Sequence, residues 1–139
     1  MKWNKLFLLA LILLNVSACA NLKKTNTTNH ITFFVGTSTN LTTEGIYTYN
    51  LDTATGKCTF QSKTANIINP SFLAIHPNNQ YLYALEREKD VNENTVRAYA
   101  INEDQSLRLL NQQSTKGKGA CYLSVGKAGK NVLIAHYGS

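Results

Sequence analysis

Three polar residues follow short apolar runs at intervals of about 50 residues, namely Thr37, Glu86 and His136. Carboxylate and imidazole groups are common general acids and bases. If the spacing brings these positions to one end of a repeating structure, Glu86 and His136 could take up or relay a proton there. Three further residues lie next to these positions or on the neighbouring run and are candidate substrate contacts: Arg87, Tyr122 and Tyr137.

Each candidate also has a simpler interpretation. Glu86 begins the charged stretch "EREKD", where a solvated carboxylate is common. His136 could merely end a strand, and Arg87 could be a charge on the rim. Tyr122 and Tyr137 could pack or form hydrogen bonds within the fold.

The elements that must position these residues are strands. From Ile31 onward, short apolar or alternating runs are separated by turn sequences such as "TATGK", "HPNNQ", "NEDQS" and "KAGK". No segment shows a sustained helical period. Asn78-Asn79 and Ala128-Gly129 stand between paired runs and predict hairpins. We therefore expect an all-β fold from residue 31 to residue 139.

The runs repeat along the chain. "SFLAIHPNNQYLYALE" (Ser71 to Glu86) aligns without a gap with "CYLSVGKAGKNVLIAH" (Cys121 to His136), 50 residues later. "IYTYNLDTATGKCTFQ" matches "VRAYAINEDQSLRLLN" in the same way, with Tyr49 over Tyr99. A period of about 50 residues with four short antiparallel strands is typical of a β-propeller blade. The sequence predicts an incomplete propeller arc with one full blade, Ser71 to Gln112, and parts of two others.

Several of these stretches resemble one family. "FFVGTSTNLTTEGIYTYNLDTATGK", "NPSFLAIHPNNQYLYALERE" and "GACYLSVGKAGKNVLIAHYGS" are similar to the opening of the lactonase family of seven-bladed propellers, which includes 6-phosphogluconolactonases of the cycloisomerase type. The chain departs from the family pattern at Ala120, Tyr122 and His136, and in the turn Gly126 to Gly129. The family's histidine-rich segment and arginine-bearing later blades have no counterpart among the 139 residues.

The resemblance implies hydrolysis of a sugar lactone. Ring opening needs an activated water and donors or cations that stabilise the tetrahedral oxyanion. No cofactor, metal or protein partner is implied, and the three histidines lack metal-ligand spacing. A non-catalytic propeller that binds a ligand or partner on its axial face is the alternative.

The predicted arc is short for this family. Seven blades of about 50 residues need about 350 residues. An isolated arc would expose the flat faces of its end blades. We therefore expect the chain alone to be marginally folded and inactive.

The first residues predict export. "MKWNK" and the apolar run Leu6 to Leu14 form a signal sequence that is short for a membrane span. Val16-Ser17-Ala18-Cys19 resembles a bacterial lipobox, which implies a signal peptide over 1–18, a lipidated Cys19 and a polar tether over 19–30. An incidental cysteine after an ordinary signal peptide is the alternative. With Ala20 next, we expect an outer-membrane lipoprotein that faces the periplasm.

Charge and cysteine content add smaller constraints. The formal net charge of +6 is scattered and partly lies in the signal segment, which argues against nucleic acid as a partner. Four loop lysines could attract an anionic sugar phosphate, although ordinary solvated surface lysines are the simpler interpretation: Lys116, Lys118, Lys127 and Lys130.

Cys58 falls on an outer strand of one blade and Cys121 on an innermost strand of another, so we expect no disulfide between them.

Overall fold

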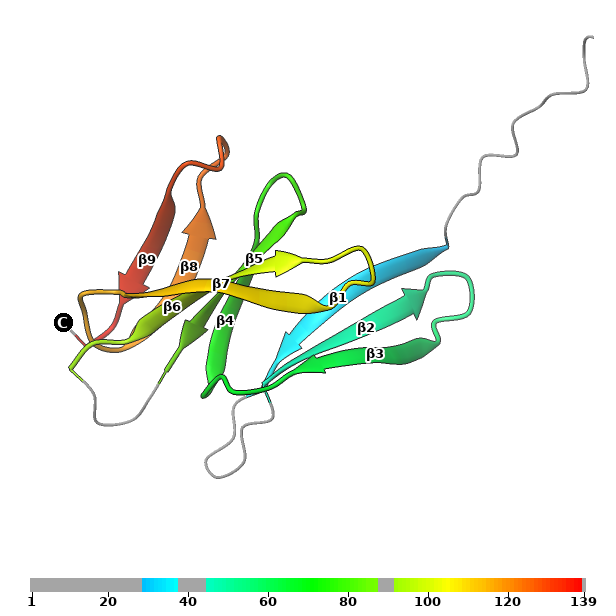
Figure 1. Cartoon of the computed structure of the whole chain (residues 1–139), viewed down its shortest axis with the longest axis horizontal. Helices are drawn as coiled ribbons and strands as arrows, with labels where there is room; N and C mark the ends of the chain where they lie inside the picture. Colours follow the sequence, from blue (N-terminus) through cyan, green and yellow to red (C-terminus); the bar gives the residue numbers. More distant parts are fainter. Residues whose placement is uncertain (1–28, 38–44, 88–91, 139) are drawn as a thin grey trace, which may run out of the picture.

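A computed structural model describes residues 29–37, 45–87 and 92–138 of the chain. Nine strands form in these ranges, with turns and bends between them (Figure 1). Among the described residues no helix could cross a membrane. The predicted signal peptide, Cys19 and most of the predicted tether lie outside the described residues.

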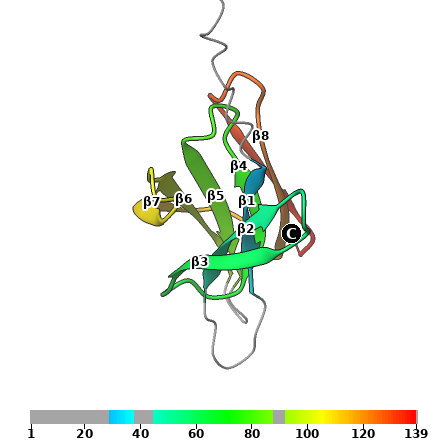
Figure 2. The same cartoon turned by 90° about the vertical axis from the view of Figure 1, so that its right-hand side faces the viewer.

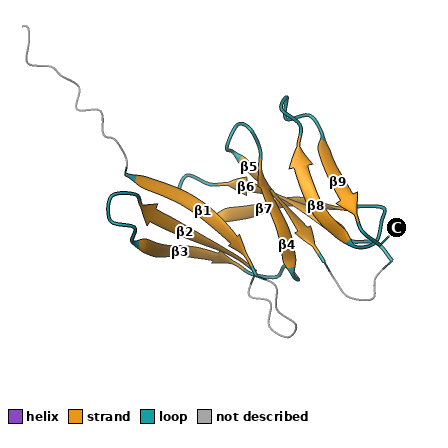
Figure 3. Ribbon diagram, turned by 180° about the vertical axis from the view of Figure 1, so that it is seen from behind, coloured by secondary structure: helices purple, strands orange, loops and turns teal. Residues whose placement is uncertain are grey.

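The strands form three antiparallel sheets, which we call the first, second and third blade. The first blade has the order β1-β2-β3, the second β4-β5-β6-β7 and the third β8-β9. Their bounds are β1 His30–Gly36, β2 Ile46–Asp52, β3 Cys58–Thr64, β4 Pro70–Ile75, β5 Tyr81–Glu86, β6 Thr95–Ile101, β7 Leu107–Ser114, β8 Ala120–Val125 and β9 Val132–His136. The prediction of one four-stranded blade between two partial ones is therefore confirmed (Figure 3).

The second blade packs against a neighbour on each side. Strand side chains alternate between two faces, so both faces of one sheet can carry apolar residues. On β5, Leu82 and Ala84 point to the first blade and join one apolar cluster with Ile46 and Tyr99. Leu85, on the opposite face of β5, joins a second cluster with residues of the third blade. The second blade is thus apolar on both faces, and burial of these faces holds the arc together.

The inner and outer edges of the blades are distinct. β4 contacts β1 on one side and β8 on the other, and in the turned view β4 and β8 lie on one side of the molecule while β6 and β7 lie on the other (Figure 2). Cys58 lies on β3, the outermost strand of the first blade, and Cys121 lies on β8. Both thiols are free and exposed.

The repeat extends to details of the backbone. The predicted hairpins join β4 to β5 and β8 to β9, and the N–H groups of His76 and Gly126 close them on the carbonyls of Tyr81 and Asn131, at 2.9 and 2.8 Å. The strand register shifts after Pro70 and again after Ala120, 50 residues later. Residues with positive φ recur at the same offset, as the pairs Asn66 and Lys116, Asn69 and Gly119, and Asn79 and Gly129.

One hydrogen bond ties the hairpins of neighbouring blades together. Nε2 of His76 lies 3.1 Å from the carbonyl oxygen of Gly129. A Cβ on Gly129 would overlap the His76 ring, and φ there is +71°. Glycine is therefore required at this turn for both its conformation and the close approach of the imidazole.

Candidate functional site

Thr37, Glu86 and His136 lie at equivalent strand ends. Glu86 ends β5 opposite Pro70, and His136 ends β9 opposite Ala120. Thr37 comes directly after β1, and its N–H donates to the carbonyl of Gly45 at 3.2 Å, which continues the ladder between β1 and β2. The strand ends therefore bring all three residues to one end of the arc.

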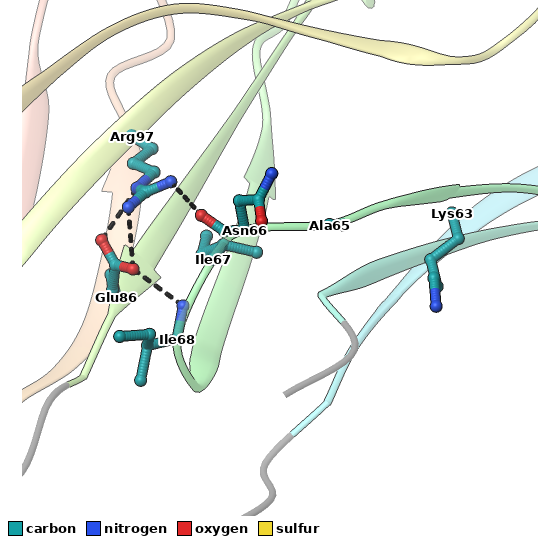
Figure 4. A pocket seen from close by; sticks show the side chains of 7 residues that line it. All are labelled: Lys63, Ala65, Asn66, Ile67, Ile68, Glu86 and Arg97. Atoms are coloured by element: carbon teal, nitrogen blue, oxygen red, sulfur yellow. Dashed lines mark hydrogen bonds and ion pairs between the residues drawn. The ribbon is translucent and has the colours of Figure 1, made fainter. Parts of the chain in front are cut away.

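Glu86 lies in a buried ion pair with Arg97 of β6 (Figure 4). Its residue exposure is 3%. The Nε of Arg97 donates to Oε2 at 2.8 Å and Nη2 donates to Oε1 at 2.9 Å, while the N–H of Ile68 donates to Oε1 at 2.7 Å. Such bidentate, charge-assisted pairs are among the strongest hydrogen bonds in proteins. The interpretation of Glu86 as a solvated carboxylate is therefore wrong, because its side chain is buried and binds Arg97 and the N–H of Ile68.

The ion pair fastens a crossover segment to the second blade. Residues 65–69 run from β3 to β4, and Arg97 also donates from Nη1 to the carbonyl of Asn66. Both carboxylate oxygens of Glu86 accept hydrogen bonds from groups of the fold. A general base needs a lone pair directed at the proton that it takes. This geometry favours a structural role for Glu86.

Sequence reasoning missed Arg97. Its signal was present, because it is the single charged residue in the strand "TVRAYAI". On β6, Arg97 lies opposite Ala84, and Thr95 lies opposite Glu86. Arg97 is thus the diagonal neighbour of Glu86. Side chains at such diagonal positions of an antiparallel pair are within reach of each other when they are long.

His136 takes the corresponding place in the third blade. Its ring packs against Gly117, where an added Cβ would lie 2.6 Å from Nδ1. Gly117 belongs to the crossover 115–119 between β7 and β8, which corresponds to the crossover that Glu86 binds. Nδ1 is buried and has no hydrogen-bond partner among the described residues. Glu86 and His136 thus each face their own crossover.

The predicted substrate contacts lie at the same end of the arc but do not form one cluster. Arg87 is exposed, and its N–H donates to the carbonyl of Asn69 at 3.2 Å. Tyr137 follows His136 and is 90% exposed. The ring centroid of Tyr122 lies 4.6 Å from that of Phe72 on the inner strand of the next blade, which favours the packing interpretation of Tyr122.

A cavity of about 440 Å³ lies beside the ion pair, between the first and second blades. Its lining is shown in Figure 4 and comprises Lys63, Ala65, Asn66, Ile67, Ile68, Glu86 and Arg97. Lys63 lies apart from the Glu86–Arg97 pair in this view. The described residues contain no group of three side chains suited to hold a metal ion. This cavity can accept a small polar molecule, but the groups around it do not form a catalytic dyad.

Tyr99 makes the stability of this region depend on pH. Its side chain is buried next to Arg97, and burial raises its pKa above the ordinary value of about 10. The folded chain therefore keeps the phenol proton at a pH where the unfolded chain loses it. The stabilisation is complete below the unfolded pKa and is lost as pH rises through the folded pKa.

We expect urea midpoints to fall between about pH 9.5 and pH 11.5, in the range where tyrosines ionise. Tyr99→Phe should flatten this decline, whereas Tyr137→Phe, at an exposed position, should not. Equal declines in Tyr99→Phe and the parent would contradict this assignment.

Comparison with known proteins places this geometry in a family. Residues 32–139 match the model of "Lactonase, 7-bladed beta-propeller". A Bacillus subtilis protein named 6-phosphogluconolactonase is 35% identical over 107 residues, which are 76% of this chain and 30% of that protein. A Formosa agariphila protein of the same name is 29% identical over 94 residues, covering 67% of this chain and 27% of its own length.

A solved structure shows the same arrangement. The crystal structure of a candidate 6-phosphogluconolactonase from Bacteroides fragilis superposes with a TM-score of 0.73 at 33% identity, over 81% of this chain and 31% of that one. The chain therefore spans less than a third of the length of these relatives. The family model covers residues 32–139, which include β2 to β9 in full and β1 from its third residue onward. The chain therefore belongs to the lactonase family of seven-bladed β-propellers.

Proposed function

We propose that the chain contributes blades to a sugar-lactone hydrolase of the 6-phosphogluconolactonase type. The observation that carries the proposal is its membership of the lactonase family, together with relatives named 6-phosphogluconolactonase. Of the two acid–base candidates, His136 retains a buried nitrogen without a partner among the described residues, whereas Glu86 is bound on both oxygens. We therefore assign proton transfer in this part of the site to His136 and the fastening of the crossover to Glu86.

A chimera tests this proposal. Residues 32–139 would replace the matched segment of the Bacillus subtilis relative, and hydrolysis of 6-phosphogluconolactone and of gluconolactone would be followed in a pH-stat. We expect the chimera to hydrolyse at least one lactone. The 139-residue chain without its predicted signal peptide should show no hydrolysis, because it spans 30% of that relative.

Two substitutions in the chimera separate the roles. His136→Ala should lower kcat by about 10²–10⁴-fold, as expected for loss of a general acid or base. Glu86→Gln should lower the melting temperature and leave kcat of the folded fraction close to that of the chimera. An unchanged kcat in His136→Ala would refute its assignment.

A non-catalytic propeller remains the second candidate, because the geometry leaves Glu86 without a free oxygen. A chimera with native circular dichroism and cooperative melting that hydrolyses neither lactone would favour this candidate. Equilibrium binding of the same two lactones would then show whether the axial end of the blades still recognises a sugar ring.

We further propose that Cys19 anchors the chain to the outer membrane from the periplasmic side. Support comes from the residue types around Cys19, which lies outside the described residues. Expression of the full chain in a Gram-negative host with radiolabelled palmitate should give a labelled, membrane-associated protein. Cys19→Ser should abolish labelling, and Cys58→Ser is the matched control. Labelling that persists in Cys19→Ser would overturn the proposal.

A further inference from the structure

Asn69 holds the backbone of Arg87 with two hydrogen bonds. The N–H of Arg87 donates to the carbonyl oxygen of Asn69 at 3.2 Å, and Nδ2 of Asn69 donates to the carbonyl oxygen of Arg87 at 3.1 Å. Asn69 is the last residue of the crossover 65–69, and Arg87 directly follows β5. The two bonds therefore fix the peptide groups on both sides of Arg87, at the end of the arc where the predicted site residues lie.

Asparagine is an unfavourable residue for the fold at position 69. Its φ is +43°, in a region that residues with a side chain rarely adopt. It also precedes Pro70, and a residue before proline favours extended backbone. In addition, Oδ1 of Asn69 is buried and has no hydrogen-bond partner among the described residues. A buried acceptor without a partner lowers the stability of the folded chain.

The third blade shows that the backbone does not need asparagine at this turn. The equivalent residue is Gly119, with a φ of +69°. The N–H of Tyr137, which is equivalent to Arg87, donates to the carbonyl oxygen of Gly119 at 2.9 Å. The main-chain bond thus forms with glycine as well, and glycine adopts positive φ without strain. The contribution specific to asparagine is the second bond, which holds the carbonyl of Arg87.

Arg87 is the residue that this second bond orients. It is exposed, and it makes no ion pair with any residue that the structure describes. A guanidinium binds a phosphate group through two parallel N–H groups, so its direction of approach matters. A side chain on a fixed backbone also loses less freedom on binding than one on a loose segment. The bonds to Asn69 therefore suit Arg87 to anion binding.

We propose that Asn69 is a positioning residue, which holds Arg87 so that its guanidinium binds the phosphate group of a phosphorylated sugar lactone. This inference rests on the proposed function, because it assigns substrate selectivity to the same end of the blades. It accounts for the presence of a residue that suits the fold less well than glycine, since strained backbone tends to occur at functional sites. Asn69 acts through Arg87 and does not itself contact the phosphate.

Equilibrium binding to the chimera tests this role without requiring turnover. Isothermal titration calorimetry would compare 6-phosphogluconate with gluconate, the acids formed from the two lactones, which differ only in the phosphate group. We expect the chimera to bind 6-phosphogluconate at least about tenfold more tightly, as one charge-assisted contact provides. Asn69→Gly and Arg87→Ala should each remove most of this ratio and leave the affinity for gluconate unchanged.

Two further variants separate positioning from folding. Asn79→Gly makes the same substitution at an exposed position of positive φ, where the third blade also has glycine, and should leave both affinities unchanged. The double variant Asn69→Gly and Arg87→Ala should bind 6-phosphogluconate no more weakly than Arg87→Ala alone, because Asn69 acts through Arg87. The melting temperature of Asn69→Gly should stay close to that of the chimera, since glycine suits the backbone there.

The possible results distinguish this inference from the proposed function. Equal binding of the two acids by the chimera, or a ratio that persists in Asn69→Gly, would overturn the inference. A large fall in the melting temperature of Asn69→Gly would do the same, because asparagine would then serve the fold. A chimera that hydrolyses neither lactone, but has the binding ratio and loses it in Asn69→Gly, would refute the proposed function and support the inference.

Discussion

Arg97→Met should lower the free energy of unfolding by about 3–5 kcal/mol, because it leaves the buried Glu86 carboxylate without its charged partner. Removing one member of a buried ion pair is costly since the remaining charge cannot be solvated. The crossover 65–69 also loses a donor to the carbonyl of Asn66. Urea denaturation followed by far-ultraviolet circular dichroism, at one fixed protein concentration, measures the effect.

Two comparisons make this prediction specific. The double variant Glu86→Gln and Arg97→Met removes both charges and should recover part of the loss. Lys116→Met breaks the ion pair between Lys116 and Glu93, whose charged atoms lie 3.5 Å apart on exposed side chains. It should change the free energy of unfolding far less than Arg97→Met does, because water screens exposed ion pairs. If Lys116→Met and Arg97→Met had equal effects, the buried pair would not fasten the fold.

Leu82→Ala and Leu85→Ala should each cost about 2–5 kcal/mol, because both leucines are fully buried and truncation leaves a cavity. Their locations differ. Leu82 packs towards the first blade and Leu85 towards the third. Amide hydrogen exchange should therefore accelerate mainly in β1 to β3 for Leu82→Ala, and mainly in β8 and β9 for Leu85→Ala.

Leu109→Ala on β7 serves as the control for both truncations. Its side chain is about half exposed, so the change should cost much less than truncation of either buried leucine. Identical exchange patterns in Leu82→Ala and Leu85→Ala would show that the blades unfold as one unit, and would contradict the division into two separate cores.

The arrangement of strands could be predicted from the sequence because a propeller repeats local patterns. The alternation of apolar and polar residues predicted the strands, and the offset of 50 residues showed which strands are equivalent in successive blades. Turn residues such as Gly129 predicted the hairpins. These signals are local, and the structure confirms them because neighbouring blades obey the same local rules.

The chemistry of the site could be predicted only in part. The repeat placed Glu86 and His136 at equivalent strand ends, but their partners depend on contacts between distant segments. Glu86 meets Arg97 and Ile68 because β5, β6 and the crossover converge, and "EREKD" contains no sign of this. The packing of Tyr122 on Phe72 likewise depends on how two blades lie against each other.

The positions of positive φ have a consequence for how the sequence can change. Asn66 and Asn79 adopt this conformation in the second blade, and Lys116 and Gly129 adopt it 50 residues later. Asparagine and glycine tolerate this region, whereas lysine gains nothing from it. Equivalent turn positions in neighbouring blades can therefore be compared within one chain. The comparison shows that Lys116 is less suited to its positive φ than Asn66 is at the equivalent position. The residue found in one blade thus indicates which substitution would stabilise the equivalent turn of the next.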